Sequence, residues 1–155
     1  KFIDVAEAPP LIVLVVALAL SAASCNKANR PISYSVGEEA YGGIVIKVSD
    51  GGLHGLVVAK VDQVLSTDYL DYDESLELIA TYSEGGTAWR LPNKEELELI
   101  YTKKASLGTF RNWYYWSSTK NGNLPWACQF GVNAAYPSNF KCPNNGFNSR
   151  AVKDF

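Results

Sequence analysis

The aromatic-rich last third of the chain constrains the fold more than any other part of the sequence. From Asn112 onward, aromatic residues alternate with Asn, Gly, Ser and Pro, and helix formers are few. This composition favours short strands joined by long ordered loops, because aromatic residues are enriched in strands and the other four supply turns. The aromatic positions are Trp113, Tyr114, Tyr115, Trp116, Trp126, Phe130, Tyr136, Phe140 and Phe147.

Two β-branched runs earlier in the chain predict a hairpin. Residues 44–48 (Ile-Val-Ile-Lys-Val) and 56–59 (Leu-Val-Val-Ala) are separated by the turn residues Asp50, Gly51 and Gly52. The alternating segment 150–155 can pair with this hairpin. Such closure of early and late strands would bring the loops together on one side of the domain.

An acidic start and helical spacing predict a first helix over residues 73–80. Its apolar residues Leu76, Ile79 and Ala80 have the spacing of one helix face. The surrounding acidic patch lacks the Gly and the terminal Glu of a calcium-binding EF-hand loop, so we interpret it as charge at a helix N-terminus. That patch consists of Asp68, Asp71, Asp73 and Glu74.

A second helix is predicted from Lys94 to about Tyr101. Asn93 has the properties of an N-cap, and Glu96 stands three residues later, as in a capping box. Leu97, Ile100 and Tyr101 would form the inner face.

These elements predict one α+β domain over residues 34–155, with two helices and a small antiparallel sheet. The 155-residue chain is 47% hydrophobic, which is enough to bury a core. A small and polar stretch, residues 26–33, reads as the linker that precedes the domain.

Residues 1–25 form an apolar N-terminal segment that has two readings. The uninterrupted apolar run from Leu11 to Leu20 is too short for a membrane-spanning helix, which needs about 20 such residues. It suits the core of a signal peptide, and Ala22-Ala23-Ser24-Cys25 resembles a bacterial lipobox whose cysteine, Cys25, becomes lipidated. Against this, Asp4 and Glu7 precede the run where a leader should be basic. The other interpretation is a structural strand or short helix that is buried against its own domain or, as an assembly segment, against a neighbouring copy.

Five motifs occur in register over nearly everything after Tyr41, and together they resemble a known family. This is the bacterial surface-domain family named after the C-terminal domain of Legionella collagen-like protein. The resemblance implies a C-type-lectin-like fold, surface display that often uses a lipid anchor, and ligand binding in place of catalysis. The motifs are Tyr-Gly-Gly-Ile-Val-Ile (41–46), His-Gly-Leu-Val-Val-Ala (54–59), Trp-Arg-Leu-Pro-Asn-Lys-Glu-Glu-Leu (89–97), Tyr-Trp-Ser-Ser-Thr (115–119) and Arg-Ala-Val-Lys-Asp-Phe (150–155).

The tail also resembles the variable regions of proteins diversified by retroelements, where adenine mutagenesis scatters Asn codons within a fixed frame. On that hypothesis Cys128 and Cys142 would be accidental products of the mutagenesis. Trp113, Lys120, Gln129 and Lys141 would belong to the frame. The candidate ligand-facing positions would be Asn121, Asn123, Asn133, Tyr136, Asn139, Phe140, Asn144 and Asn145.

Individual aromatic and charged residues are expected to have either core or ligand-binding roles. Trp89, Trp116 and Trp126 are expected in the core, because tryptophan buries a large area and its N–H needs only one partner. Arg90 and Arg150 are expected to pair with carboxylates such as Glu95, Glu96 or Asp154. Trp113, Tyr114, Tyr136 and Phe140 are better ligand candidates, because they stand among loop residues where rings can stack on sugars or bind a protein.

Composition argues against several other functions. Lys and Arg total 14 against 16 Asp and Glu, without a basic cluster, so no nucleic-acid partner is expected. The three cysteines lack zinc or redox spacing, although a bridge between Cys128 and Cys142 is compatible with an oxidising compartment. The single histidine, His54, leaves a nucleophile without an activating base. We therefore expect no enzyme, no cofactor and no metal site.

The resulting functional prediction is an extracellular or cell-surface adhesion domain that binds a surface protein or glycan through its loops. Membrane contact would occur only through a lipid anchor at Cys25. The alternative is a structural subunit of a self-assembling extracellular filament or pilus, in which Leu11 to Leu20 packs into neighbouring copies.

Overall fold

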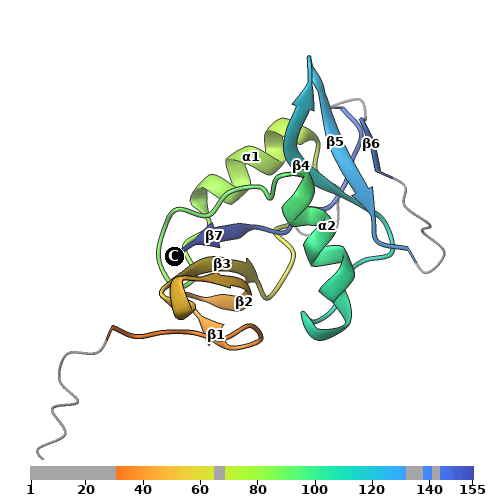
Figure 1. Cartoon of the computed structure of the whole chain (residues 1–155). Helices are drawn as coiled ribbons and strands as arrows, with labels where there is room; N and C mark the ends of the chain where they lie inside the picture. Colours follow the sequence, from red (N-terminus) through yellow and green to blue (C-terminus); the bar gives the residue numbers. More distant parts are fainter. Residues whose placement is uncertain (1–30, 65–68, 132–137, 141–143) are drawn as a thin grey trace, which may run out of the picture. The chain divides into compact units, whose positions relative to one another are not determined.

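The computed structural model describes residues 31–64, 69–131, 138–140 and 144–155 (Figure 1). Several predictions therefore lie outside the described residues: both readings of the N-terminal segment and the roles of Cys25, Asp68, Asn133, Tyr136 and Cys142. Asn139 and Phe140 are described only as backbone of a strand.

Two helices and two antiparallel sheets make up the described domain, which confirms the α+β class, although the sequence suggested one sheet. The first sheet has the strand order β1-β2-β3-β7, and the second has the order β4-β5-β6. The strands are β1 (Glu39–Ala40), β2 (Gly43–Ser49), β3 (His54–Ala59), β4 (Tyr114–Asn121), β5 (Leu124–Gln129), β6 (Ser138–Phe140) and β7 (Val152–Asp154). The helices are α1 (Tyr72–Thr81) and α2 (Lys94–Lys103), with short 3-10 turns η2 (Asp50–Gly52) and η3 (Lys104–Ser106).

The predicted hairpin and its closure by the late strand are both confirmed. β2 and β3 pair across η2, and β7 pairs antiparallel with β3. Gly51 in the turn has a φ of 67°, a left-handed conformation that glycine adopts without a steric penalty. The register shifts between Val45 and Lys47, which marks a β-bulge in β2.

Both helices begin with a capping box, as the sequence predicted for α2. The Asn93 side chain accepts from the Glu96 N–H at 2.8 Å, and the Glu96 carboxylate accepts from the Asn93 N–H at 2.8 Å. Asp71 and Glu74 form the equivalent pair at α1, which confirms the helix-start interpretation for those two acidic residues.

The predicted inner face of α1 is wrong in part. Leu76 is 40% exposed and Ala80 is also exposed, whereas Tyr72, Ser75 and Ile79 are buried. The helix begins one residue earlier than predicted, at Tyr72, and this aromatic residue sets the buried stripe at positions i, i+3 and i+7. On α2, Leu97 and Ile100 are buried as predicted, and Tyr101 is half-buried.

The core has two parts, separated by the first sheet. Val45, Val57 and Ala59 belong to the part that includes residues of α1, and the alternate positions belong to the part that includes residues of α2 (Figure 1). Trp89, Trp116 and Trp126 are 6%, 0% and 3% exposed, which confirms their core assignment.

The segment 147–152 pairs with β3, with β4 and with three positions outside the named strands. Phe147 pairs with Leu70, Asn148 with Tyr115, Ser149 with Gln63, and Val152 with Arg90 as well as with β3. These pairings bring distant parts of the sequence into contact with one late, extended segment. Leu70 is consequently held beside Phe147 by two backbone hydrogen bonds.

Candidate functional site

Two exposed aromatic side chains, Tyr69 and Trp113, lie side by side on the surface. Tyr69 is 47% exposed and Trp113 is 39% exposed. Their ring centroids are 5.9 Å apart, and the ring planes are inclined by 38°. We call this pair the aromatic platform.

The backbone around Gly146 fixes the aromatic platform. The indole Nε1 of Trp113 donates to the Gly146 carbonyl at 3.2 Å, and Leu70 exchanges two backbone hydrogen bonds of 2.9 Å with Phe147. A Cβ at position 146 would lie 2.8 Å from Tyr69 Cβ, so glycine allows the close approach of the two segments. Three chain segments thus hold the two rings before any ligand arrives.

Tyr114 and Phe147 support the platform from the core side. Tyr114 stacks on Phe147 with centroids 4.9 Å apart, and Phe147 packs against Trp116 at 4.4 Å. Trp113 meets Tyr114 edge to face at 5.6 Å. Tyr114 is half-buried, so it lies at the border of the core, and its ligand role stays a prediction.

The structure divides the asparagine candidates between two places. Asn144 and Asn145 are exposed and directly precede Gly146, so they flank the aromatic platform. Asn121 and Asn123 are exposed at the tip of the β4–β5 hairpin, where Gly122 has a φ of 56°. The strand β4 separates that tip from Tyr114 by roughly 20 Å at the usual rise per residue, so the structure does not unite all candidates in one patch.

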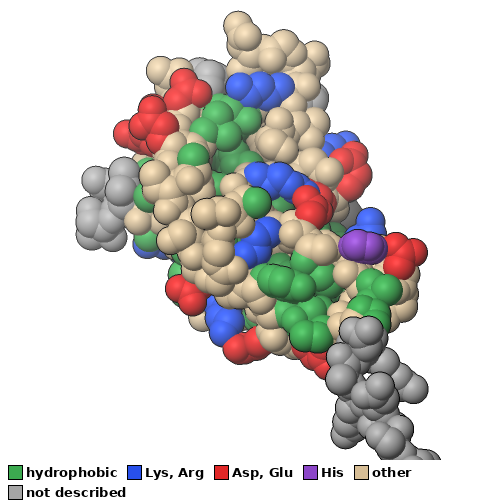
Figure 2. Space-filling view, turned by 90° about the vertical axis from the view of Figure 1, so that its left-hand side faces the viewer, with side chains coloured by type: hydrophobic (Ala, Val, Ile, Leu, Met, Phe, Trp, Pro, Cys, Tyr) green, Lys and Arg blue, Asp and Glu red, His purple; other side chains and the backbone are tan. Residues whose placement is uncertain are grey.

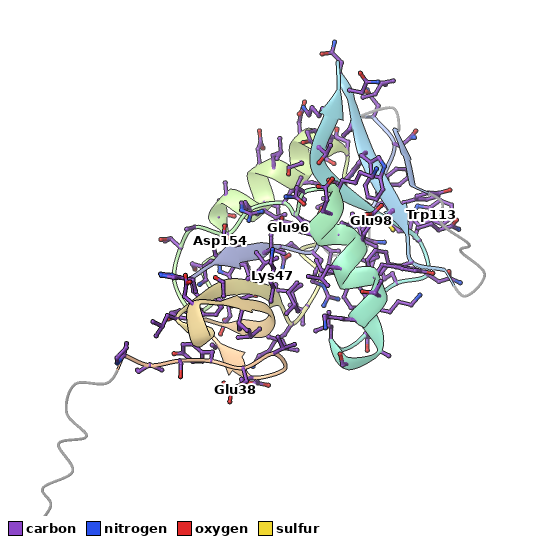
Figure 3. The ribbon with its side chains drawn as sticks, viewed as in Figure 1. Glu38, Lys47, Glu96, Glu98, Trp113 and Asp154 are labelled. Carbon is purple, nitrogen blue, oxygen red and sulfur yellow. The ribbon has the colours of Figure 1, made fainter. Side chains whose placement is uncertain are left out.

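Tyr69 is the platform residue that the sequence did not reveal. It stands in an acidic stretch, remote from the aromatic-rich tail, and only the Leu70–Phe147 pairing brings it beside Trp113. Figure 3 shows Trp113 well apart from the charged residues Lys47, Glu96 and Asp154, so the platform and that charged cluster are separate surfaces.

Groups with potential for catalysis or metal binding are dispersed. His54 is exposed at the start of β3 (Figure 2). In the described part of the chain, no group of three or more His, Cys, Asp or Glu residues could hold a metal ion. Cys128 is buried, and burial raises the pKa of its thiol to about 12, which disfavours the reactive thiolate.

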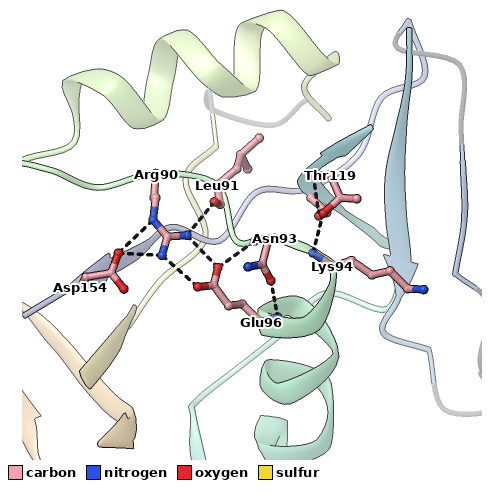
Figure 4. A network of polar contacts seen from close by, with 8 residues as sticks. Arg90, Leu91, Asn93, Lys94, Glu96, Thr119 and Asp154 are labelled. Atoms are coloured by element: carbon pink, nitrogen blue, oxygen red, sulfur yellow. Dashed lines mark hydrogen bonds and ion pairs between the residues drawn. The ribbon is translucent and has the colours of Figure 1, made fainter. Parts of the chain in front are cut away.

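Both arginines make ion pairs, and the prediction for Arg90 is confirmed. Its guanidinium contacts Glu96 through Nη1 at 2.7 Å and Nη2 at 2.9 Å, and contacts Asp154 through Nη2 at 2.7 Å (Figure 4). Arg150 pairs instead with Asp62, a carboxylate that the sequence did not suggest. These pairs stabilise the fold, and neither arginine belongs to the platform.

Comparison with other proteins adds no family assignment. Of the helices that the structure describes, none has the length and apolar character needed to cross a membrane. No protein-family model matches the chain, and a search of curated proteins finds no match.

Proposed function

We propose that this chain is a bacterial surface or extracellular adhesion protein whose folded domain binds a protein or glycan and does not catalyse a reaction. The observation that supports this most directly is the pre-positioned aromatic platform of Tyr69 and Trp113. Exposed Tyr and Trp residues supply much of the binding energy where they occur at the centre of interfaces.

The rigidity of the platform supports a binding role. A hydrogen bond to Gly146 and an edge-to-face contact with Tyr114 already restrict the Trp113 side chain, so little additional side-chain freedom is lost when a ligand binds. The asparagines beside it, Asn144 and Asn145, present amide donors and acceptors that can complete recognition.

We further propose that the domain has a C-type-lectin-like fold. The motif order supports this assignment, as does the closure of the β2–β3 hairpin by β7. Surface display with lipidation at Cys25 is part of the same proposal, resting on the resemblance of residues 22–25 to a lipobox.

The platform can be tested by labelling the full chain and measuring its binding to a glycan array and to immobilised extracellular-matrix proteins. Trp113→Ala and Tyr69→Ala should each weaken binding to the selected ligand by at least about tenfold. Leu124→Ala is a matched control, because Leu124 is 45% exposed at the tip of the β4–β5 hairpin.

Two results would contradict the proposal: binding to none of these ligands, or binding that both platform substitutions leave unchanged. Large assemblies of the purified chain that disappear on deletion of residues 11–20 would instead favour the filament alternative.

A further inference from the structure

A pocket of about 290 Å³ lies on the first sheet beside the first turn of α2. It is separate from the aromatic platform. Figure 2 shows His54, the single histidine, on the surface among basic, acidic and apolar side chains. The lining residues that matter here are Lys47, Ser49, His54, Leu56, Glu96 and Asp154.

The strand register explains why these residues share one face of the sheet. Lys47 pairs with Leu56, and Leu56 pairs with Asp154, so the three form a row across β2, β3 and β7. Ser49 and His54 form the next row on the same face, because side chains alternate along a strand. The bulge after Val45 permits this arrangement, since it places both Ile46 and Lys47 on the side of α2.

Arg90 holds the negative side of the pocket in place. Both Glu96 oxygens accept hydrogen bonds from the Arg90 guanidinium. Asp154 accepts from Arg90 through Oδ2, at 2.7 Å from Nη2 and 3.2 Å from Nε. The Oδ1 atom makes no hydrogen bond with another described residue, and the Asp154 side chain is 68% exposed. One carboxylate oxygen of a fixed side chain therefore remains for a cation.

On the positive side of the pocket, the ammonium group of Lys47 is also available to a ligand. Lys47 is exposed and forms no hydrogen bond or ion pair with any of the other residues described. Ser49 and His54, in the neighbouring row, offer further hydrogen-bond donors. Figure 3 shows Lys47, Glu96 and Asp154 near one another, where β2 and β7 approach the start of α2.

We propose that this pocket binds a small zwitterion of the α-amino-acid type. The ligand ammonium group contacts Asp154, and its carboxylate contacts Lys47 with help from Ser49 and His54. A simple anion would meet the carboxylates of Glu96 and Asp154, whereas a ligand with both charges complements both sides. The volume is at the lower end for ligand pockets, which suits a single small amino acid.

Isothermal titration calorimetry of the full chain with glycine and L-alanine tests the site, with acetate and methylammonium as singly charged probes. Glycine should bind more tightly than either singly charged probe. Lys47→Gln should weaken glycine binding at least about tenfold, because the substitution removes a charge-assisted contact. Lys103→Gln, in the last turn of α2, is the matched control and should leave binding unchanged.

Thermal unfolding of each variant checks that the fold persists, which is the expected result because Lys47 is exposed. The proposal is overturned if no amino acid binds at about 10 mM, if acetate binds as tightly as glycine, or if Lys47→Gln binds like the parent chain. Trp113→Ala should not affect glycine binding, so failure here and failure of the proposed platform are independent results.

Discussion

The guanidinium Nε of Arg150 donates to Asp62 Oδ1 at 2.6 Å, and the two side chains are only 1% and 10% exposed. The remaining guanidinium nitrogens donate to three backbone carbonyls, of Ala59, Lys60 and Thr109. This buried pair joins the end of β3 to the late segment that precedes β7. The charge of Arg150 is fully compensated by these contacts, so the effect of removing the Asp62 carboxylate on stability can be predicted.

Asp62→Asn should destabilise the domain by about 3–5 kcal/mol, because it leaves the buried Arg150 charge without its counter-ion. Urea unfolding followed by circular dichroism measures the change. Glu39→Gln is the control, since Glu39 forms an exposed pair with Lys60 and should change stability by less than about 1 kcal/mol. Equal effects of the two substitutions would contradict the assignment.

Tyr115→Phe should destabilise the domain by about 1–3 kcal/mol, because it removes the hydroxyl that donates to Asp62 Oδ2 at 2.7 Å. Burial, and then the charge of Asp62, raise the pKa of Tyr115 well above its ordinary value of 10.0. At pH values below the ordinary pKa, the Tyr115 hydroxyl keeps its proton in both the folded and the unfolded chain, so the stabilisation is complete. As pH rises above it, the unfolded state loses the proton first and the stabilisation declines.

The stability difference between the parent chain and Tyr115→Phe should therefore shrink above about pH 10. Urea unfolding over a pH series measures it. A difference that stays constant or grows with pH would show that the Tyr115 hydroxyl is not held protonated by the fold.

Glu96→Gln should lower the free energy of unfolding at neutral pH, and this loss should disappear in acid. Burial alone would raise the pKa of Glu96, but hydrogen bonds from Arg90 and the Asn93 backbone, with the charges of Arg90 and Lys47, lower it below the ordinary 4.5. This stabilisation is complete above the unfolded value and is lost as pH falls through the folded one. The difference from the parent chain should therefore decrease below about pH 4.5.

Glu95→Gln controls for the loss of a carboxylate in the same helical turn, since Glu95 is exposed. Thermal unfolding at pH values between neutral and acid compares the two variants. If Glu95→Gln shows the same pH-dependent loss, the effect belongs to the helix terminus in general and not to the Arg90 pair.

Gly146→Ala should disturb the aromatic platform, because the added Cβ would lie 2.8 Å from Tyr69 Cβ. We expect a loss of about 1–3 kcal/mol in stability from overpacking and a changed tryptophan fluorescence. Binding through the platform should weaken in parallel. Asn145→Ala is the neighbouring control, since that side chain is exposed, and an equal effect of both would argue against a steric cause.

Local signals predicted much of the fold. The β2–β3 hairpin and the capping box of α2 each depend on a few adjacent residues and are confirmed. The pairing of the late strand with the hairpin joins distant parts of the sequence and is also confirmed, because the alternating pattern of residues 150–155 indicated a strand. The face of α1 was wrong because its apolar residues are few, so that one additional residue, Tyr72, changes the buried stripe.

The candidate site was less predictable than the fold. Trp113 stands out in the aromatic-rich tail, but Tyr69 becomes its neighbour only through a long-range backbone pairing. The partner of Arg150 was hidden for the same reason, because Asp62 is 88 residues away in sequence. Contacts of this kind leave no periodic pattern along a chain.

The late segment 147–152 also sets the order in which this protein can acquire its structure. Its bridges to Leu70, Gln63, Tyr115 and Arg90 join parts of the chain that are made much earlier. During synthesis, those parts are made before this segment, and their apolar faces stay exposed until it pairs with them. Folding should accordingly be slow and largely post-synthetic, as expected for long-range topologies. Under the proposed surface location, that delay would help export, because a chain that is still open can pass through a translocation pore.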